Sequence, residues 1–182
     1  MVGREPNRPE PQVLRPLSGP KRLENAARAM PLTVGTPAPD FSLVSQNRDR
    51  ISLDDLKGKK SMIVFMPYPH TRTCESEACE IRDNWAAFEG IDANVVMITT
   101  HAGATNRDWA EDNDYPFPIL SDYWPHGDVS RAYDTFDETF GYAKRTTYIL
   151  DSDGVIRDVI ASDVLGEARP FSAYLPALES VS

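Results

Sequence analysis

The sequence predicts an α/β fold in which a central mixed sheet carries helices on both faces. Two continuous apolar runs, SMIVFM at 61–66 and NVVMITT at 94–100, are typical of buried strands. Apolar residues at helical spacing lie between these runs, and such alternation of strands and helices indicates a layered sheet. An Asp-Ser-Asp-Gly turn within 146–161 predicts a hairpin near the C-terminus, so we expect the sheet to be mixed rather than wholly parallel.

The other elements follow from local patterns. Residues 40–53 alternate around a polar turn, which predicts an N-terminal hairpin. The segment 71–89 contains no proline or glycine, and its apolar residues recur at helical spacing, so it predicts a helix. Further helices are expected over 104–114, 126–136 and 170–180, and a short strand over 116–122. We expect Pro176 to limit or kink the last helix.

Length and composition predict a single domain and a cytoplasmic protein. The chain has 182 residues, 41% of them hydrophobic, which is enough for a single sizeable core. Its formal charge of -9 makes nucleic acid and anionic membranes unexpected partners. Two cysteines do not make a disulfide-stapled secreted scaffold, and the longest apolar run is too short to span a bilayer.

The first thirty residues differ from the rest. They are rich in proline, arginine and glutamate, so they cannot bury enough surface to order themselves. We therefore expect a disordered N-terminal extension over 1–30 and a globular domain over 31–182. The alternatives are an arginine-bearing interaction tail, or an upstream start codon with Met30 as the true beginning. No apolar run follows the basic residues, which argues against a secretory signal.

The two cysteines, Cys74 and Cys79, lie just after the first buried run. Ligands of open α/β sheets bind beyond the carboxyl ends of the strands, and Cys74 falls there. Thr71 and Thr73 are both good N-cap residues, and either cap places Cys74 in the first turn of the helix. The unpaired N–H groups of a first turn favour an anion, and a thiol attacks as its thiolate.

The charges around this helix start predict that a cation lies close to the thiol. Glu75, Glu77 and Glu80 suit a helix N-terminus but repel a thiolate. Arg72 is the local candidate for the compensating cation, and an arginine from another strand is the better one.

The spacing of the two cysteines excludes a disulfide within an intact helix. Residues five apart on a helix lie roughly 8–9 Å apart between Cα atoms, whereas a disulfide needs less than about 7 Å. Pairing of Cys74 with Cys79 therefore requires the first turns to unwind. The alternative is that one or both are inert core residues, and this fits Cys79, beside Ala78, better than Cys74.

The segment PYPHTRTC has the form P-x-x-x-T-x-x-C and resembles the active-site motif of the peroxiredoxins. The segments 34–43 (VGTPAPDFSL) and 117–157 also resemble that family, and the second is most similar to its alkyl hydroperoxide reductase E class. CESEACEIRD, with cysteines at its first and sixth positions, instead resembles the bacterioferritin-comigratory, or Q-type, class. The resemblance covers roughly residues 32 to 180.

This resemblance implies a thioredoxin-like fold and a thiol-dependent peroxidase that reduces hydrogen peroxide and alkyl hydroperoxides. By motif position Cys74 is the peroxidatic cysteine, and it is oxidised to a sulfenic acid. Thr71 would bind the thiolate and the peroxide through its hydroxyl, and Pro67 would shield the pocket from water. Arg145 would be the cation that the charges require, and Glu77 would orient an arginine.

The resemblance leaves the resolving step open. Cys79 matches the resolving position of the Q-type class, and we favour an intramolecular disulfide because a nearby thiol has a high effective concentration. The alternative is a one-cysteine cycle resolved by an external thiol such as mycothiol or a glutaredoxin-like protein. Thioredoxin-, glutaredoxin- or mycoredoxin-like proteins, or low-molecular-weight thiols, are the expected reductants. Family members are monomers or homodimers.

Two other classes of function are weaker alternatives. A thioredoxin-like disulfide carrier should have a C-x-x-C pair and a proline before the strand at 146–150, where this chain has Arg145 and Thr146. A redox sensor would share the sulfenic acid step. The family usually has an aromatic residue where this chain has His70, and we favour a packing role over a proton donor there. His101 and His126 lack zinc-ligand spacing and no phosphate loop occurs, so no metal or cofactor is expected.

Overall fold

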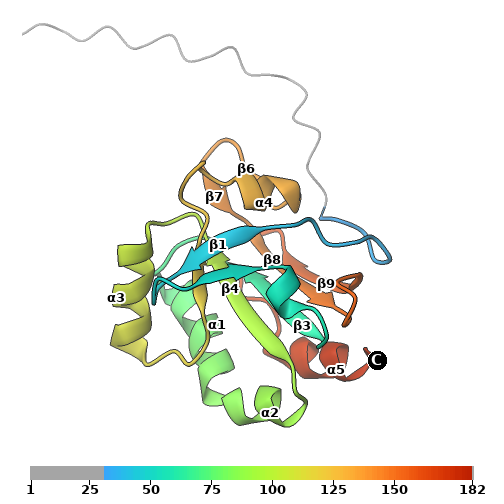
Figure 1. Ribbon diagram of the computed structural model, residues 1–182. Coiled ribbons are helices and arrows are strands. Elements are labelled where there is room, and N and C mark those ends of the chain that lie inside the picture. Colours follow the sequence, from blue (N-terminus) through green and yellow to red (C-terminus); the bar gives the residue numbers. More distant parts are fainter. Residues whose placement is uncertain (1–30, 182) are drawn as a thin grey trace, which may run out of the picture.

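The computed structural model describes residues 31–181, so the predicted extension over 1–30 lies outside the described residues. A seven-stranded sheet runs through the molecule in the order β2-β1-β5-β4-β3-β8-β9 (Figure 1). Its strands are β1 Ser42–Ser45, β2 Arg50–Ser52, β3 Ser61–Phe65, β4 Asn94–Thr99, β5 Ile119–Ser121, β8 Arg145–Leu150 and β9 Ile156–Ser162. A separate small ribbon consists of β6 Phe136–Asp137 and β7 Tyr142–Ala143.

The sheet is mixed, as the sequence predicts. Strands β3, β4 and β5 are parallel, whereas β8 runs antiparallel to β3, and β1 runs antiparallel to β5. Both predicted hairpins are present, as β1–β2 and β8–β9. The turn at 151–154 closes the second hairpin, with the carbonyl of Asp151 accepting a hydrogen bond from Gly154 N at 3.0 Å.

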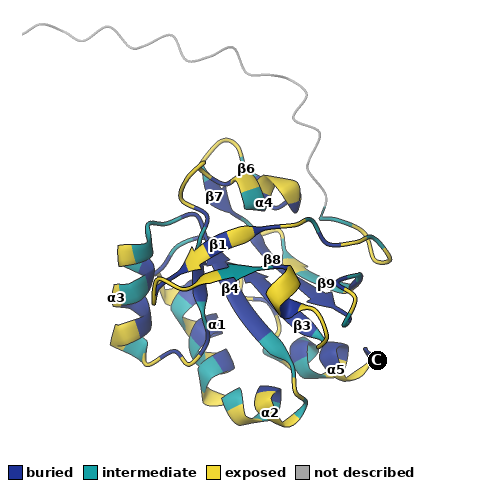
Figure 2. Ribbon diagram, viewed as in Figure 1, coloured by how far each residue is buried: buried dark blue, intermediate teal, exposed yellow. Residues whose placement is uncertain are grey.

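Of the five α-helices in the described residues, four pack against one face of the sheet, and α4 Asp128–Ala132 packs with its end against the other. The other four are α1 Arg72–Asp83, α2 Trp85–Gly90, α3 Gly103–Asn113 and α5 Tyr174–Glu179, and 3-10 turns lie at Asp54–Leu56 and Phe171–Ala173. Alternate side chains of β3 point to opposite faces. Met62 and Val64 join a core with α1, α2, α3 and α5, and Ile63 and Phe65 join a second core with Leu56 and Tyr133. Figure 2 shows the buried residues along the strands and on the inner sides of the helices.

The predicted single helix over 71–89 is two helices. Asn84 interrupts it with φ -110° and ψ 19°, and its side-chain amide donates a hydrogen bond to the carbonyl of Glu80 at 2.9 Å. An asparagine side chain can bond a backbone carbonyl in place of a helical N–H and so end a helix. The apolar residues keep helical spacing on both sides of Asn84, so the spacing does not reveal the break.

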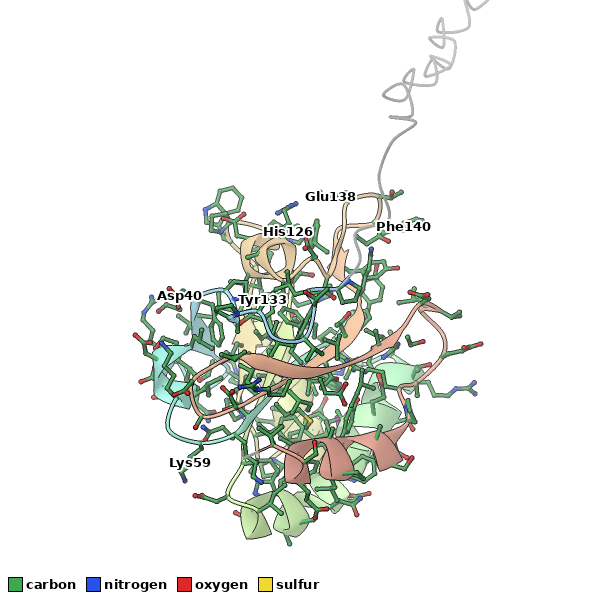
Figure 3. All side chains as sticks on the ribbon, turned by 90° about the vertical axis from the view of Figure 1, so that its right-hand side faces the viewer. Asp40, Lys59, His126, Tyr133, Glu138 and Phe140 are labelled. Atoms are coloured by element: carbon green, nitrogen blue, oxygen red, sulfur yellow. The ribbon has the colours of Figure 1, made fainter. Side chains whose placement is uncertain are left out.

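The predicted helix over 126–136 is correct only for α4. Asp134 adopts a left-handed φ of 50°, and Thr135 N donates to Ser130 O at 2.9 Å, which is a Schellman ending. The chain then enters β6. Figure 3 shows His126, Glu138 and Phe140 at the outer end of this unit, and Tyr133 deeper in the molecule.

The predicted helix over 170–180 is a 3-10 turn, Phe171–Ala173, followed by α5, and Pro176 limits where the α-helical part begins, as the sequence predicts. Helix α5 begins at Tyr174, so Pro176 lies in its first turn, where no intrahelical N–H bond is lost. No helix in the described part of the chain is long and apolar enough to cross a membrane.

Candidate active site

Cys74 lies in the first turn of α1, beyond the carboxyl end of β3. Thr71 is the N-cap residue, with extended φ and ψ, and its carbonyl accepts the first helical hydrogen bond, from Glu75 N at 2.8 Å. Thr73, the other possible cap, is inside the helix and donates instead to the carbonyl of Gly166 at 3.3 Å. The first-turn N–H groups therefore surround the position of Cys74, which favours an anion there.

Strand pairing brings Arg145 to this thiol from a distant part of the chain. In the β3–β8 register Phe65 pairs with Thr146, which places Arg145 beside the end of β3. The guanidinium Nη2 donates a hydrogen bond to Cys74 Sγ at 3.1 Å, and Nε donates to the carbonyl of Leu165 at 2.9 Å. The strand-borne cation, and not Arg72, is thus the one in contact with the sulfur.

Glu77 lies between two arginines in the interior of the site. One of its carboxylate oxygens pairs with Nη1 of Arg145. The other accepts hydrogen bonds from Arg169, from the backbone N–H at 2.7 Å and from Nε at 2.9 Å. All three side chains are at most 2% exposed. The carboxylate is therefore shared by both arginines and fixes their positions.

Sequence reasoning missed Arg169. It follows β9, after a stretch of loop for which the sequence predicts no element, and only its final position next to β3 makes it a member of the site. Its Nη1 donates to the carbonyl of Phe65 at 2.9 Å and to the hydroxyl of Thr147 at 3.0 Å. Burial alone lowers the pKa of Arg169, but Tyr174 and Glu77 raise the pKa above its ordinary value, so the residue is a permanent cation.

The buried charges balance only when the sulfur is ionised. Arg145 and Arg169 contribute two positive charges and Glu77 contributes one negative charge. A neutral thiol at Cys74 leaves one uncompensated charge in a site where Cys74 itself has no exposed surface. Uncompensated buried charge is strongly unfavourable. The arrangement therefore favours the thiolate, which is the nucleophilic form.

Thr71 and Pro67 lie in the segment that leads from β3 into α1. The Thr71 hydroxyl donates to the carbonyl of Tyr68 at 2.9 Å, which leaves its oxygen able to accept a proton donor. Pro67 is buried and follows β3 after one intervening residue, Met66. Burial, and then the charges of Asp137 and Cys74, raise the pKa of Tyr68, so its phenol stays protonated.

Cys79 occupies a different environment, on the side of α1 that faces α3. Its sulfur lies 3.7 Å from the hydroxyl of Tyr115 and donates to Oδ1 of Asn113 at 3.9 Å. Arg82 donates to the backbone carbonyl of Asn113 at 2.8 Å and so lies close by. Both cysteines are free thiols on one unbroken helix, so their spacing is that of the intact helix.

His70 is exposed and has a left-handed φ of 60°. Its ring lies 6.3 Å, centroid to centroid, from that of buried Trp109. The ring of His101 is edge-on to that of Tyr68 at 5.7 Å, and its buried Nδ1 has no hydrogen-bond partner among the described residues.

A cavity of about 210 Å³ leads to the arginine that contacts the thiol. Its walls are mainly carbon and are formed by Tyr68, Thr71, Arg72, Thr73, Arg145, Leu165 and Gly166. A small molecule in this cavity would lie against Arg145, next to the buried sulfur of Cys74.

Comparison with known proteins places this geometry in context. Residues 34–159 match the model of the AhpC/TSA family. The chain is 40% identical over 152 residues to alkyl hydroperoxide reductase E of Mycobacterium tuberculosis (strain ATCC 25618 / H37Rv), across 83% of this chain and 99% of the relative.

Two further relatives are more distant. The putative peroxiredoxin bcp of Coxiella burnetii is 32% identical over 136 residues, across 71% of this chain and 89% of the relative. The crystal structure of peroxidoxin BcpB from Mycobacterium tuberculosis has a TM-score of 0.74 at 27% identity, across 83% of this chain and 99% of that one.

Proposed function

Because the chain belongs to the AhpC/TSA family and is a thiol-dependent peroxidase of the thioredoxin-like fold, we propose that Cys74 is its peroxidatic cysteine. The observation that carries the proposal is the contact between Arg145 and Cys74, inside a buried cluster that is neutral only with a thiolate. Within residues 31–181, Cys79 has no such cluster around it, and its sulfur makes two long contacts, with Asn113 and Tyr115.

The first step is a nucleophilic displacement on the peroxide. The Cys74 thiolate attacks the hydroxyl-bearing oxygen of ROOH, and the O–O bond breaks. Cys74 becomes a sulfenic acid, and the leaving RO⁻ takes a proton from water to give the alcohol, or water when R is hydrogen. Arg145 and the first-turn N–H groups of α1 stabilise the charge that moves from sulfur to the leaving oxygen.

Thr71 and Pro67 support this step in our proposal. With its proton donated to the carbonyl of Tyr68, the Thr71 hydroxyl accepts the O–H of the incoming peroxide and orients it for attack. Pro67 offers no N–H that competes for the thiolate and keeps water from the buried end of the cavity. Glu77 acts through Arg145 and Arg169 and does not touch the peroxide.

We further propose that Cys79 resolves the sulfenic acid. Its thiol displaces water from Cys74, a disulfide forms, and the first turns of α1 unwind to bring the sulfurs together. Until then the intact helix keeps the two sulfurs apart, and the Cys79 sulfur lies 3.7 Å from the hydroxyl of Tyr115. The disulfide is reduced by a thioredoxin-, glutaredoxin- or mycoredoxin-like protein or a small thiol, in the reducing cytoplasm. The rival is direct resolution by an external thiol, as a one-cysteine enzyme.

Substrate choice and assembly are also proposals. Alkyl hydroperoxides join hydrogen peroxide as substrates, which the name of the reductase E relative and the mainly carbon cavity both support. We place the protein among the monomers and homodimers of its family.

Stopped-flow measurement of peroxide reduction tests the central proposal. Reduced protein is mixed with hydrogen peroxide or tert-butyl hydroperoxide, in parallel with Cys74→Ser and Cys79→Ser. We expect Cys74→Ser to consume no peroxide and Cys79→Ser to retain the first turnover. Peroxide consumption by Cys74→Ser at the wild-type rate would contradict the assignment.

A further inference from the structure

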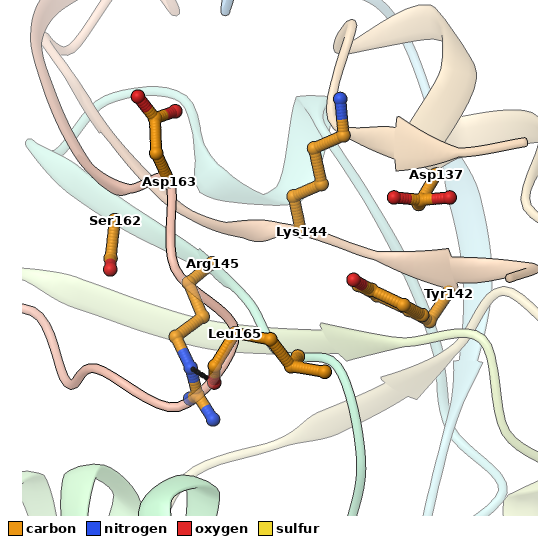
Figure 4. A pocket seen from close by; sticks show the side chains of 7 residues that line it. All are labelled: Asp137, Tyr142, Lys144, Arg145, Ser162, Asp163 and Leu165. Atoms are coloured by element: carbon orange, nitrogen blue, oxygen red, sulfur yellow. Dashed lines mark hydrogen bonds between the residues drawn. The ribbon is translucent and has the colours of Figure 1, made fainter. Parts of the chain in front are cut away.

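Leu165 separates two cavities that meet at the reactive arginine. The first is the mainly carbon cavity beside Cys74 described above. The second, also of about 210 Å³, is lined by Asp137, Tyr142, Lys144, Arg145, Ser162, Asp163 and Leu165 (Figure 4). Of the described residues, Arg145 and Leu165 are the two that line both cavities. Arg145 is held in place by its contacts with Cys74 and Glu77. Of the two shared residues, it is therefore the Leu165 side chain that can differ in size without changing those contacts.

The backbone of Leu165 is held in place independently of its side chain. Its carbonyl accepts the hydrogen bond from Arg145 Nε at 2.9 Å, drawn in Figure 4. The next carbonyl, that of Gly166, accepts from Thr73 at 3.3 Å. These two bonds attach the loop after β9 to Arg145 of β8 and to Thr73 in the first turn of α1. A change of the Leu165 side chain therefore leaves the support of Arg145 in place.

The side chain of Leu165 is open both to solvent and to the two cavities. It is 42% exposed, although it is a large apolar residue beside a catalytic cavity. Hydrogen peroxide has no carbon, so it gains nothing from such a wall. An organic hydroperoxide would cover Leu165 with its alkyl or aryl group while its O–O group lies against Arg145. Burial of that apolar surface would favour the organic substrate alone.

The second cavity limits the size of that organic group. Beyond Leu165 the walls carry Asp137, Lys144 and Asp163, and in Figure 4 the side chains of Lys144 and Asp163 extend away from the guanidinium. A long hydrocarbon chain that passed Leu165 would strip water from these charged groups, which is unfavourable. The first cavity therefore suits compact organic groups.

We propose that Leu165 is a specificity-determining residue, whose side chain contacts the compact alkyl or aryl group of an organic hydroperoxide bound at Cys74. The proposal rests on the proposed role of Cys74 and adds a preference of the same site. It makes no use of the resolving step.

The test compares Leu165→Ala with Val164→Ala. Val164 is the neighbouring exposed apolar residue, 50% exposed, and it lines neither cavity. Single-turnover oxidation of each reduced protein is measured with hydrogen peroxide and with cumene hydroperoxide. We expect Leu165→Ala to lower the cumene hydroperoxide rate constant about tenfold, as loss of partly buried methyl groups predicts, and the hydrogen peroxide rate constant less than about twofold. Val164→Ala should change neither.

The alternative outcomes are distinct. An equal fall with both peroxides would mean that Leu165 acts only through Arg145, and would overturn the proposal. Unchanged selectivity, or the same shift in Val164→Ala, would also overturn it. If the wild type reduced no peroxide, or Cys74→Ser remained active, the role of Cys74 would fail instead. Circular dichroism of each variant checks that the fold is retained.

Discussion

The Glu77 carboxylate accepts two hydrogen bonds from Arg169, at 2.7 Å from its backbone N–H and at 2.9 Å from Nε. Its other oxygen pairs with Arg145, which in turn contacts Cys74. Helix α1, strand β8 and the loop after β9 are thereby joined at one buried carboxylate. Because Glu77 lies between Cys74 and Cys79 on α1, the unwinding that we propose for pairing of the cysteines would also loosen this carboxylate from its arginines.

Replacement of Glu77 should therefore lower the stability of the protein as well as its rate of reaction with peroxide. Glu77→Gln keeps the shape but removes the carboxylate that joins the two buried arginines, so we expect a loss of about 3 to 5 kcal/mol in the free energy of unfolding. Urea denaturation measures it. Glu80→Gln is the matched control, since Glu80 is exposed on the same helix, and we expect a change within about 0.5 kcal/mol. Equal losses in the two variants would contradict the buried-charge argument.

Arg145 should be required for reaction with peroxide. Arg145→Met removes the contact at 3.1 Å with Cys74 Sγ and the donor for the leaving oxygen, so we expect the second-order rate constant to fall about 10²- to 10³-fold. Arg145→Lys should fall between wild type and Arg145→Met, since one ammonium cannot serve Cys74, Glu77 and Leu165 together.

Arg72→Met is the comparison that separates the strand-borne cation from the local one. Arg72 is exposed at the start of α1, so we expect a loss of about fivefold or less. Rate constants from stopped-flow oxidation measure all three variants. A larger loss in Arg72→Met than in Arg145→Met would show that the local arginine is the important one.

The sequence was informative where local pattern and family motif agree. Continuous apolar runs predicted β3 and β4, and the N-cap threonines predicted a helix that begins just before Cys74. Two helix ends were not predictable from apolar spacing, because Asn84 and Asp134 end helices through their own backbone and side-chain geometry. Such endings depend on single residues that the spacing does not reveal.

Within the site, Arg145 could be predicted from the sequence, whereas Arg169 could not. Arg145 could be predicted as the cation near the thiol because it lies in a segment that resembles the family. Arg169 lies in irregular chain, where no periodicity predicts a position, and only the return of the loop after β9 carries it to Glu77. Long-range contacts of loop residues have no local signal in the sequence.

Cys79 should determine how the sulfenic acid disappears. After one equivalent of hydrogen peroxide, with no thiol added, we expect wild type to lose two hydrogens by mass. Both cysteines lie in one tryptic peptide, 73–82, bounded by Arg72 and Arg82, so the disulfide appears as an internal mass loss there. Cys79→Ser should instead gain one oxygen and be trapped by dimedone. Gain of an oxygen by the wild type would favour the one-cysteine cycle.

His70 should prove to be a packing residue. Its ring lies against Trp109 and its φ is 60°, and no hydrogen bond joins it to Cys74 in the described part of the chain. At each pH from about 5.5 to 8.5, we expect the rate constant of His70→Phe with hydrogen peroxide to stay within about threefold of the wild-type value. Loss of a general acid would instead cost about a hundredfold or more. A hundredfold loss with an altered pH profile would identify His70 as the proton donor.

His101 should make stability depend on pH. Burial, and then the nearby charge of His126, lower the pKa of His101 below its ordinary value of 6.5. Its buried Nδ1 has no acceptor for a second proton. The unfolded chain therefore binds a proton below pH 6.5 that the folded chain resists, so stability falls as pH drops through that region. His101→Gln cannot titrate, so the wild type should lose more stability than the variant between about pH 7.5 and 5.5. Urea midpoints at both pH values measure this difference, and equal losses would contradict it.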